Sequence, residues 1–249
     1  MPDNTDTNST PADTSRFATT HWSVVLAAGS PSSARYHEAL EVLCRTYWFP
    51  LYAFLRRQGY DTHQAEDCIQ GFFACLLEKQ GLRLADANRG KFRSYLLGAL
   101  KHFMADQHDR AHTQKRGGHC RVFSLDIDRG EDQYTPELAH QLSPDKLFER
   151  SWALTVLRRT ADKLKAEWSA KHKQALFQQL VVYLAPVEET VSYRAMAAKL
   201  NMSETAVKTA IYRMRKRYRE LLRSEVAQTV ATKDHIEDEL RELFSAFSS

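Results

Sequence analysis

The sequence predicts an all-α protein of two helical domains joined by an acidic linker, with a helix-turn-helix at the end of the second domain. Three observations predict this class. Glycine and proline are scarce, at 9 and 7 of 249 residues, so few helix-breaking positions interrupt the chain. Apolar residues recur at intervals of three and four along most of its length, as on the buried face of a helix. Hydrophobic residues make up 43% of the chain, which is enough to build real cores.

The N-terminal stretch, residues 1–16, is short and polar, and we expect it to be disordered because it has nothing to bury. It lacks the basic start and apolar run of a signal peptide, and no segment approaches the roughly 20 apolar residues of a membrane span. We therefore expect a cytoplasmic protein with no membrane partner. The cysteines form no C-x-x-C pair, which favours reduced thiols over disulfides or zinc. They are Cys44, Cys68, Cys75 and Cys120.

Residues 17–116 are expected to form the first helical domain, because three apolar stripes follow one another at helical spacing. Gly59 and Gly90 fall between the stripes, where helices can end. The stripes consist of Leu40, Leu43, Tyr47, Leu51, Phe54 and Leu55, then Ala65, Ile69, Phe72, Phe73, Leu76 and Leu77, then Phe92, Leu96, Leu97, Leu100, Phe103 and Met104.

The composition of the sequence changes over residues 117–143. This segment begins with two glycines and carries several acidic side chains, and its apolar residues show little helical periodicity. This pattern predicts an acidic linker between domains. Ser143 and Pro144 then restart a helix, since serine caps a helix N-terminus and proline is tolerated in its first turn. The second domain is expected over residues 144–229.

That domain closes on a predicted helix-turn-helix over residues 193–222. Its first helix has one apolar face and is followed by Asn201, a residue that tolerates the left-handed conformation of a helix end. Ser203 is a suitable N-cap for a second helix that begins at Glu204. The residues of the second helix expected to face the core are Val207, Ala210, Ile211, Met214 and Tyr218.

The opposite face of this second helix has the composition of a DNA-recognition surface. It offers hydrogen-bond donors for base edges near its N-terminus and Lys and Arg for phosphates further on. No acidic residue lies between Thr205 and Arg219, although the whole chain carries a net charge of only +4. An ordinary solvated helix is the alternative interpretation. The candidate contacts, including Arg194 of the preceding helix, are Arg194, Ser203, Thr205, Lys208, Thr209, Tyr212, Arg213 and Lys216.

Residues 230–249 predict an acidic amphipathic helix with one apolar side. Simple packing onto the second domain is one expectation. An inhibitory helix that covers a basic surface is the other.

Two further segments, both within residues 17–116, carry candidate functional residues. One helix presents Asp67 and Gln70 three residues apart, and a later one carries the run Phe-Arg-Ser-Tyr-Leu at 92–96 among basic residues. Together with residues 191–222, these segments resemble regions two and four of bacterial RNA polymerase sigma factors. With no region three between them, the arrangement resembles the extracytoplasmic-function (ECF) type, and the resemblance covers most of residues 20–230.

The resemblance implies a protein that binds core RNA polymerase, recognises the −35 and −10 elements of promoter DNA and promotes melting, with no cofactor and no enzymatic activity of its own. It implies −35 contacts by the recognition face and polymerase contacts by Asp67, Gln70 and Phe73. At the −10 element a flipped base requires cations and a stacking surface. The residues matched to that role are Arg93, Ser94, Tyr95, Lys101, His102 and Arg110. We expect a monomer when free, and the family leaves room for an anti-sigma factor or another regulatory partner.

Two other functions fit parts of the sequence. A free-standing helix-turn-helix regulator explains residues 190–222 but not the helix of Asp67 and Gln70. A metal-dependent helical phosphohydrolase would use a cluster in which two histidines lie four residues apart. That cluster is His102, Asp106, His108, Asp109 and His112. The chain also departs from the family, because residues 161–186 are longer than usual and lack its Leu-Pro pair, and because it carries the Trp22 segment and the tail.

Overall fold

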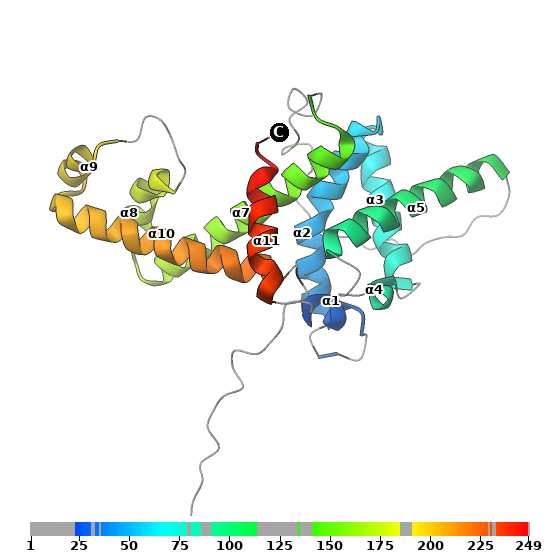
Figure 1. Cartoon of the computed structure of the whole chain (residues 1–249), viewed down its shortest axis with the longest axis horizontal. Helices are drawn as coiled ribbons and strands as arrows, with labels where there is room; N and C mark the ends of the chain where they lie inside the picture. Colours follow the sequence, from blue (N-terminus) through cyan, green and yellow to red (C-terminus); the bar gives the residue numbers. More distant parts are fainter. Residues whose placement is uncertain are drawn as a thin grey trace, which may run out of the picture.

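The computed structural model of the chain describes residues 23–30, 33–34, 36–78, 81–85, 91–113, 134, 141–184, 191–228, 230 and 233–248, and every regular element within these ranges is a helix (Figure 1). The predicted all-α class is therefore confirmed for this part of the chain. None of its helices is long and apolar enough to cross a membrane. The predictions for residues 1–16, for Trp22, for most of the linker and for Cys120 fall outside the described ranges.

The helices follow the chain in a simple order. The first half supplies α1 (Ser23–Ala28), α2 (Tyr36–Arg57), α3 (Thr62–Glu78), α4 (Gly81–Leu84) and α5 (Phe92–Thr113). The second half supplies α7 (Pro144–Ala170), α8 (Gln174–Leu180), the 3₁₀ turn η3 (Val181–Tyr183), α9 (Tyr193–Leu200), α10 (Glu204–Val226), the 3₁₀ turn η4 (Lys233–His235) and α11 (Ile236–Ser245).

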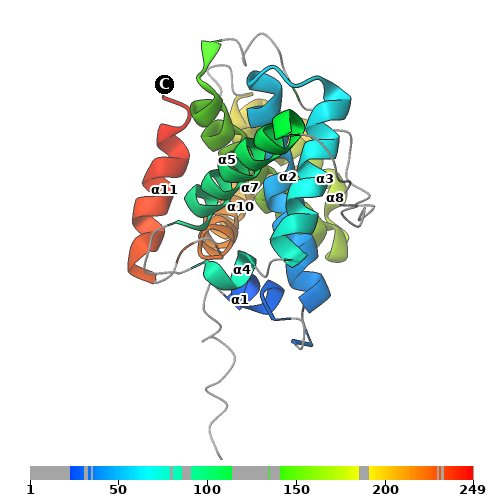
Figure 2. The same ribbon diagram turned by 90° about the vertical axis from the view of Figure 1, so that its right-hand side faces the viewer.

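The larger hydrophobic cluster forms around α2, whose residues 51–55 are almost inaccessible to solvent. Helices α3 and α7 pack against α2 (Figure 2). Helix α5 adds Phe92, whose ring meets Tyr47 edge-on with 5.3 Å between centroids. Phe148 and Trp152, from the N-terminal half of α7, are completely buried in the same cluster. The beginning of the segment that the sequence assigns to the second domain is thus part of the core around α2.

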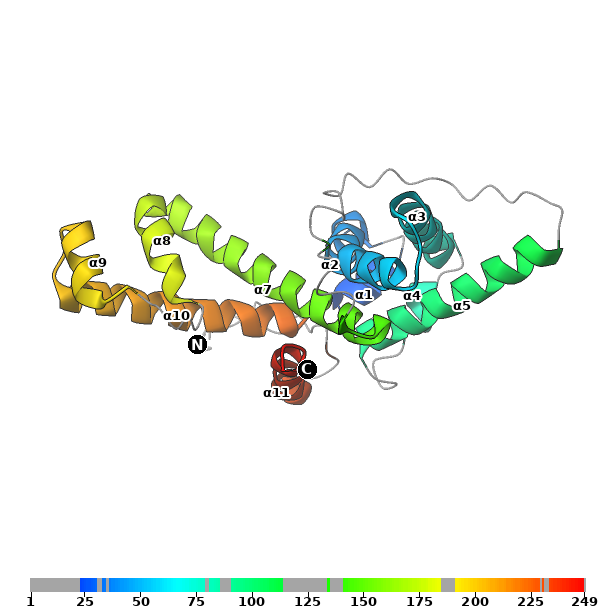
Figure 3. The same cartoon turned by 90° about the horizontal axis from the view of Figure 1, so that it is seen from above.

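A second cluster lies at the other end of α7 and α10 (Figure 3), where α8 and α9 cover the two long helices. It consists of Leu164, Phe177, Leu180, Tyr183, Met196, Ala197, Val207, Ile211 and Met214. The C-terminal part of α10, with Leu222 and Val226, belongs to the larger cluster instead. Helices α7 and α10 therefore contribute to both clusters.

Local signals define the helix ends where the sequence predicts them. The Ser143 hydroxyl accepts a hydrogen bond from the backbone N–H of Lys146 at 3.3 Å, with Pro144 in the first turn of α7. The Ser203 hydroxyl accepts from the N–H of Ala206 at 3.2 Å and caps α10. Asn201 has the left-handed conformation expected at the end of α9, with φ 51° and ψ 45°. These three predictions are confirmed.

The cysteines in the described ranges are Cys44, Cys68 and Cys75, and all three are free thiols. Burial raises the pKa of Cys44 to about 12 and that of Cys68 to about 11, so both remain protonated near neutral pH. Of these positions Cys44 is buried and the other two are half-buried.

Candidate nucleic-acid interface

Helices α9 and α10 form a compact unit joined by residues 201–203. Met196 and Ala197 of α9 are buried against Val207 and Ile211 of α10 in the second cluster. Because these apolar side chains fix the inner face of α10, residues offset by half a turn are directed to solvent. The unit lies at the end of the molecule farthest from α5 (Figures 1 and 3).

The outer face of α10 is exposed along its first three turns. Tyr212 is 64% exposed, an unusual value for a large aromatic side chain, and it lies between basic residues. All eight of the recognition residues expected from the sequence are exposed: Arg194, Ser203, Thr205, Lys208, Thr209, Tyr212, Arg213 and Lys216. This face presents hydroxyl groups near the helix N-terminus and cations further along, the order required for base edges and then phosphates.

Two residues near the N-terminus of α10, Lys208 and Thr209, contact other groups of the protein. The ammonium of Lys208 forms an ion pair with Glu204 at 2.6 Å and lies 5.5 Å from the centre of the Tyr193 ring. The Thr209 hydroxyl donates to the backbone carbonyl of Thr205 at 2.8 Å. Both side chains stay exposed, and such surface contacts exchange readily with a ligand because they are worth only a few tenths of a kcal/mol (about 0.3–0.5).

Two other arginines of α10, Arg215 and Arg217, are engaged by the protein itself. Arg215 donates through Nε to the backbone carbonyl of Tyr183 at 2.8 Å. Arg217 holds Glu167 of α7 through two nitrogen atoms, Nε at 2.9 Å and Nη2 at 2.6 Å. Hydrogen bonding from Arg217 lowers the pKa of Glu167. These two arginines hold α10 against its neighbours. Fewer basic side chains of α10 are therefore available to a ligand than the sequence suggests.

The predicted −10 residue Arg93 lies in the interior. Its side chain is 2% exposed at the start of α5, and its guanidinium carbon lies 4.2 Å from the centre of the Trp152 ring. Nε donates to Glu149 at 2.6 Å, Nη2 donates to Glu242 at 2.5 Å, and Nη1 pairs with Glu239. Burial alone would lower the pKa of Arg93, but the carboxylates of Glu239 and Glu149 outweigh it and raise the pKa. In this conformation Arg93 is not available to DNA.

The remaining predicted −10 residues are only partly accessible. Ser94 and His102 are exposed on α5. Tyr95 is half-buried and its hydroxyl donates to the carbonyl of Gly81 at 2.5 Å, so its ring supports α4. Lys101 is exposed and pairs with Asp145 at 2.5 Å. The side chain of Arg110 lies outside those that the structure describes.

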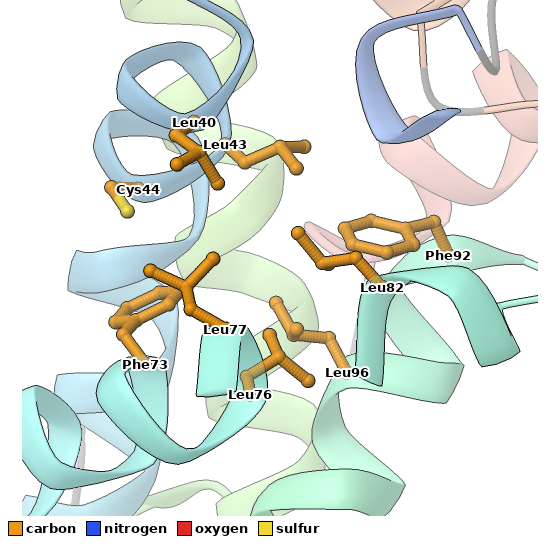
Figure 4. Close-up of a pocket in the computed structure, with 9 residues that line it drawn as sticks. All are labelled: Leu40, Leu43, Cys44, Phe73, Leu76, Leu77, Leu82, Phe92 and Leu96. Atoms are coloured by element: carbon orange, nitrogen blue, oxygen red, sulfur yellow. The ribbon is translucent and has the colours of Figure 1, made fainter. Parts of the chain in front are cut away.

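The three predicted polymerase contacts on α3 also differ in exposure. Asp67 is exposed and Gln70 is half-buried. Phe73 is 5% exposed and lines a small apolar pocket with Cys44 and Leu96 (Figure 4). Phe73 is therefore a core residue in this conformation, and Asp67 is the accessible member of the set.

The histidine-rich end of α5 is the candidate metal site. Within the part of the chain whose side chains are described, no three His, Cys, Asp or Glu residues lie close enough to hold a metal ion. His102, Asp106, His108 and Asp109 are all exposed there, and the His112 side chain is outside that part.

The carboxylates around Arg93 were not expected from the sequence. Glu239 and Glu242 lie three residues apart, beside the apolar residues Ile236 and Leu243 that anchor α11. The sequence signal that could have found Glu239 and Glu242 is their place beside the apolar face of α11. Acidic residues at such a place are held close to the surface that the helix covers.

Comparison with known proteins adds no relative, because no family model, no curated protein and no solved structure matches this chain.

Proposed function

We propose that this chain is an ECF-type RNA polymerase sigma factor, which binds core polymerase, recognises the −35 and −10 promoter elements and promotes melting. The observation that carries the proposal is the exposed outer face of α10, with Thr205, Tyr212 and Lys216 on a rigidly capped helix. The resemblance of residues 47–110 and 191–222 to sigma regions two and four supports the same function. A sigma factor acts in the cytoplasm, and we propose that location here.

In the proposed mechanism, α9 and α10 act as the helix-turn-helix and the N-terminal part of α10 enters the major groove. Thr205 and Thr209 would approach base edges, and Arg213 and Lys216 would neutralise phosphates. Arg217 and its partner Glu167 would hold α10 at a fixed angle to α7. Since hydroxyl and cationic groups occupy separate turns, sequence reading and charge neutralisation can be separated by mutation.

Core polymerase would bind the outer edge of α3 through Asp67, which is exposed, and Gln70. Ser94 and His102, which are exposed on α5, would meet the opened −10 strand. No step requires bond making or breaking by the protein. The chain contributes binding energy, which positions the polymerase on the promoter and stabilises unpaired bases.

A free-standing helix-turn-helix regulator is the second candidate, and the burial of Arg93 and Phe73 favours it. With these two residues inside, the α3 and α5 surfaces offer less for polymerase and for melted DNA than sigma factors need. The α10 face would serve such a regulator without change.

The deciding experiment is reconstitution with sigma-free bacterial core polymerase, followed by gel filtration and transcription from a promoter library. A sigma factor co-elutes with core and starts transcripts at defined sites. Asp67→Ala should abolish co-elution, whereas Glu78→Ala, an exposed carboxylate on the same helix, should not. Duplex binding without any association with core polymerase would favour the regulator and refute the sigma proposal.

A further inference from the structure

The C-terminal helix α11 lies against the N-terminal half of α7 and the end of α10 (Figure 1). Leu243 is fully buried and Ile236 is 9% exposed, so the apolar side of α11 is docked on the larger cluster. Phe244 remains 54% exposed on the other side. Leu240, Ala246 and Phe247 are partly buried against the same cluster. The apolar side of α11 thus fixes its position, and the acidic residues lie beside that side.

Those acidic residues meet the cations at the start of α5. Glu239, which is fully buried, pairs with both Lys91 and Arg93. Glu242 pairs with the same two cations, and its side chain is half exposed. Two carboxylates thus face one ammonium and one guanidinium. A phosphodiester presents two non-bridging oxygens that share one negative charge, and guanidinium and ammonium groups bind such oxygens as they bind a carboxylate.

The contacts of Arg93 come from two directions. On one side α7 holds it through Glu149 at Nε and through the face of Trp152. On the other side α11 occupies the terminal nitrogens Nη1 and Nη2. If α11 leaves, α7 continues to orient the guanidinium, and two of its donor groups become free. Arg93 is thus preorganised for a replacement anion.

A second cation on α5 also pairs with a carboxylate from another helix, although this cation stays exposed. Lys101 pairs with Asp145, at the start of α7. Lys101 lies eight residues beyond Arg93, about 12 Å along the helix at 1.5 Å per residue. Carboxylates from outside α5 therefore occupy two cationic positions spaced along one helix. Such spacing fits a chain of phosphates better than a single free phosphate.

We propose that α11 is an internal competitor of nucleic acid: Glu239 and Glu242 occupy the site at Lys91 and Arg93 where the phosphates of a single strand bind once α11 is displaced. The inference rests on the proposed function in that it takes α5 as the element that meets opened DNA. Displacement of α11 is then a requirement for use of the −10 site, and full-length protein is held inactive until it occurs.

The test is the binding of a fluorescent single-stranded oligonucleotide to full-length protein at low salt, followed by anisotropy. Replacing both carboxylates, Glu239→Gln with Glu242→Gln, should tighten binding at least fivefold. The matched control, Asp234→Asn with Asp238→Asn, changes the charge equally at two exposed positions in and just before the same helix and should alter affinity less than twofold. Equal effects of the two pairs, or no effect of the first, would overturn the proposal.

Two additional variants locate the effect. Adding Arg93→Gln to the Glu239→Gln/Glu242→Gln protein should remove the gain, and retention of the gain would place the strand elsewhere and overturn the proposal. If the double variant does not fold, Glu242→Gln alone alters only the half-exposed carboxylate and should change affinity in the same direction. A single variant no tighter than wild type would then overturn it.

Failure of this inference is distinguishable from failure of the proposed function. Co-elution with core polymerase tests the sigma proposal and does not use these glutamates. A chain that binds polymerase but gains no strand affinity retains the function and loses the inhibitory role of α11. If the variant binds single strands more tightly but the chain does not bind polymerase, the competitor role of α11 stands and the sigma proposal is refuted.

Discussion

The guanidinium of Arg93 lies over the ring of Trp152 in a cation–π contact, with 4.2 Å between the guanidinium carbon and the ring centre. Arg93 is the second residue of α5, Trp152 and Glu149 are in α7, and Glu239 and Glu242 are in α11. One arginine therefore connects three segments of the chain, and its most distant partner, Glu242, lies 149 residues away in sequence.

Trp152 should be critical for stability because it is fully buried and also supports Arg93. We expect Trp152→Ala to lower the free energy of unfolding by about 3–5 kcal/mol, from lost burial and the cavity left behind. Trp152→Phe retains an aromatic face and should cost clearly less. Urea unfolding followed by circular dichroism measures both, and equal losses for the two variants would argue against the ring contact.

Glu225 of α10 is expected to hold α10 against α7. It is 5% exposed and pairs with Arg159 at 3.2 Å and with Lys163, and Arg159 also donates to the Thr46 hydroxyl of α2 at 2.7 Å. Since both cations are partly solvated, Glu225→Gln should cost about 1–3 kcal/mol, less than a fully buried pair. Glu220→Gln, on the same helix but exposed, is the control and should change unfolding little.

Asn201 carries a conformation that other residues adopt only with strain. Its φ of 51° places it in the left-handed region, where a non-glycine side chain costs about 1–2 kcal/mol and asparagine less than most. Asn201→Ala should therefore lower stability by about 1 kcal/mol, while Asn201→Gly should be neutral or stabilising. Thermal unfolding of the pair provides the measurement, and an alanine variant as stable as the glycine variant would contradict this explanation.

Lys216 should contribute to DNA affinity through charge alone. Lys216→Ala is expected to weaken duplex binding and to reduce the slope of log affinity against log salt by about 0.9, the value for one phosphate contact. Unfolding should be unchanged within about 0.5 kcal/mol, because the side chain is exposed. Lys165→Ala removes an exposed lysine from α7 and should leave the salt slope unaltered.

Acid should loosen α11. Burial acts to raise the pKa of Glu242, but the hydrogen bond and charge of Lys91, together with Arg93, lower it overall. A carboxyl with a lowered folded-state pKa stabilises the fold above its unfolded-state value, and this contribution is lost as pH falls through the folded-state value. The protection of α11 amides against hydrogen exchange, measured relative to the intrinsic exchange rate at each pH, should fall below about pH 4.3, the ordinary value for glutamate. In Glu242→Gln, exchange should be faster at neutral pH and should depend less on acid.

Local features of this fold could be read from the sequence, and distant pairings could not. Ser143, Ser203 and Asn201 act within a few residues of themselves, so their roles follow from chain chemistry. The exposed face of α10 follows from periodicity alone. Arg93 and Phe73 were expected on surfaces because the resemblance to sigma factors implied it, although Phe73 also belongs to the second apolar stripe. Their burial is decided by α7, α11 and α2, which reach them only in the folded chain.

The sharing of α7 and α10 between both hydrophobic clusters has a mechanical consequence. In two globules tied by a loose tether, each can turn while the other stays still. Here the connection consists of two helices that pack against each other and contribute buried residues to both clusters, so the two clusters cannot separate without breaking those contacts. A partner that separates the two clusters must remove α7 or α10 from one of them. The free energy of that step is the minimum that the binding of the partner has to supply.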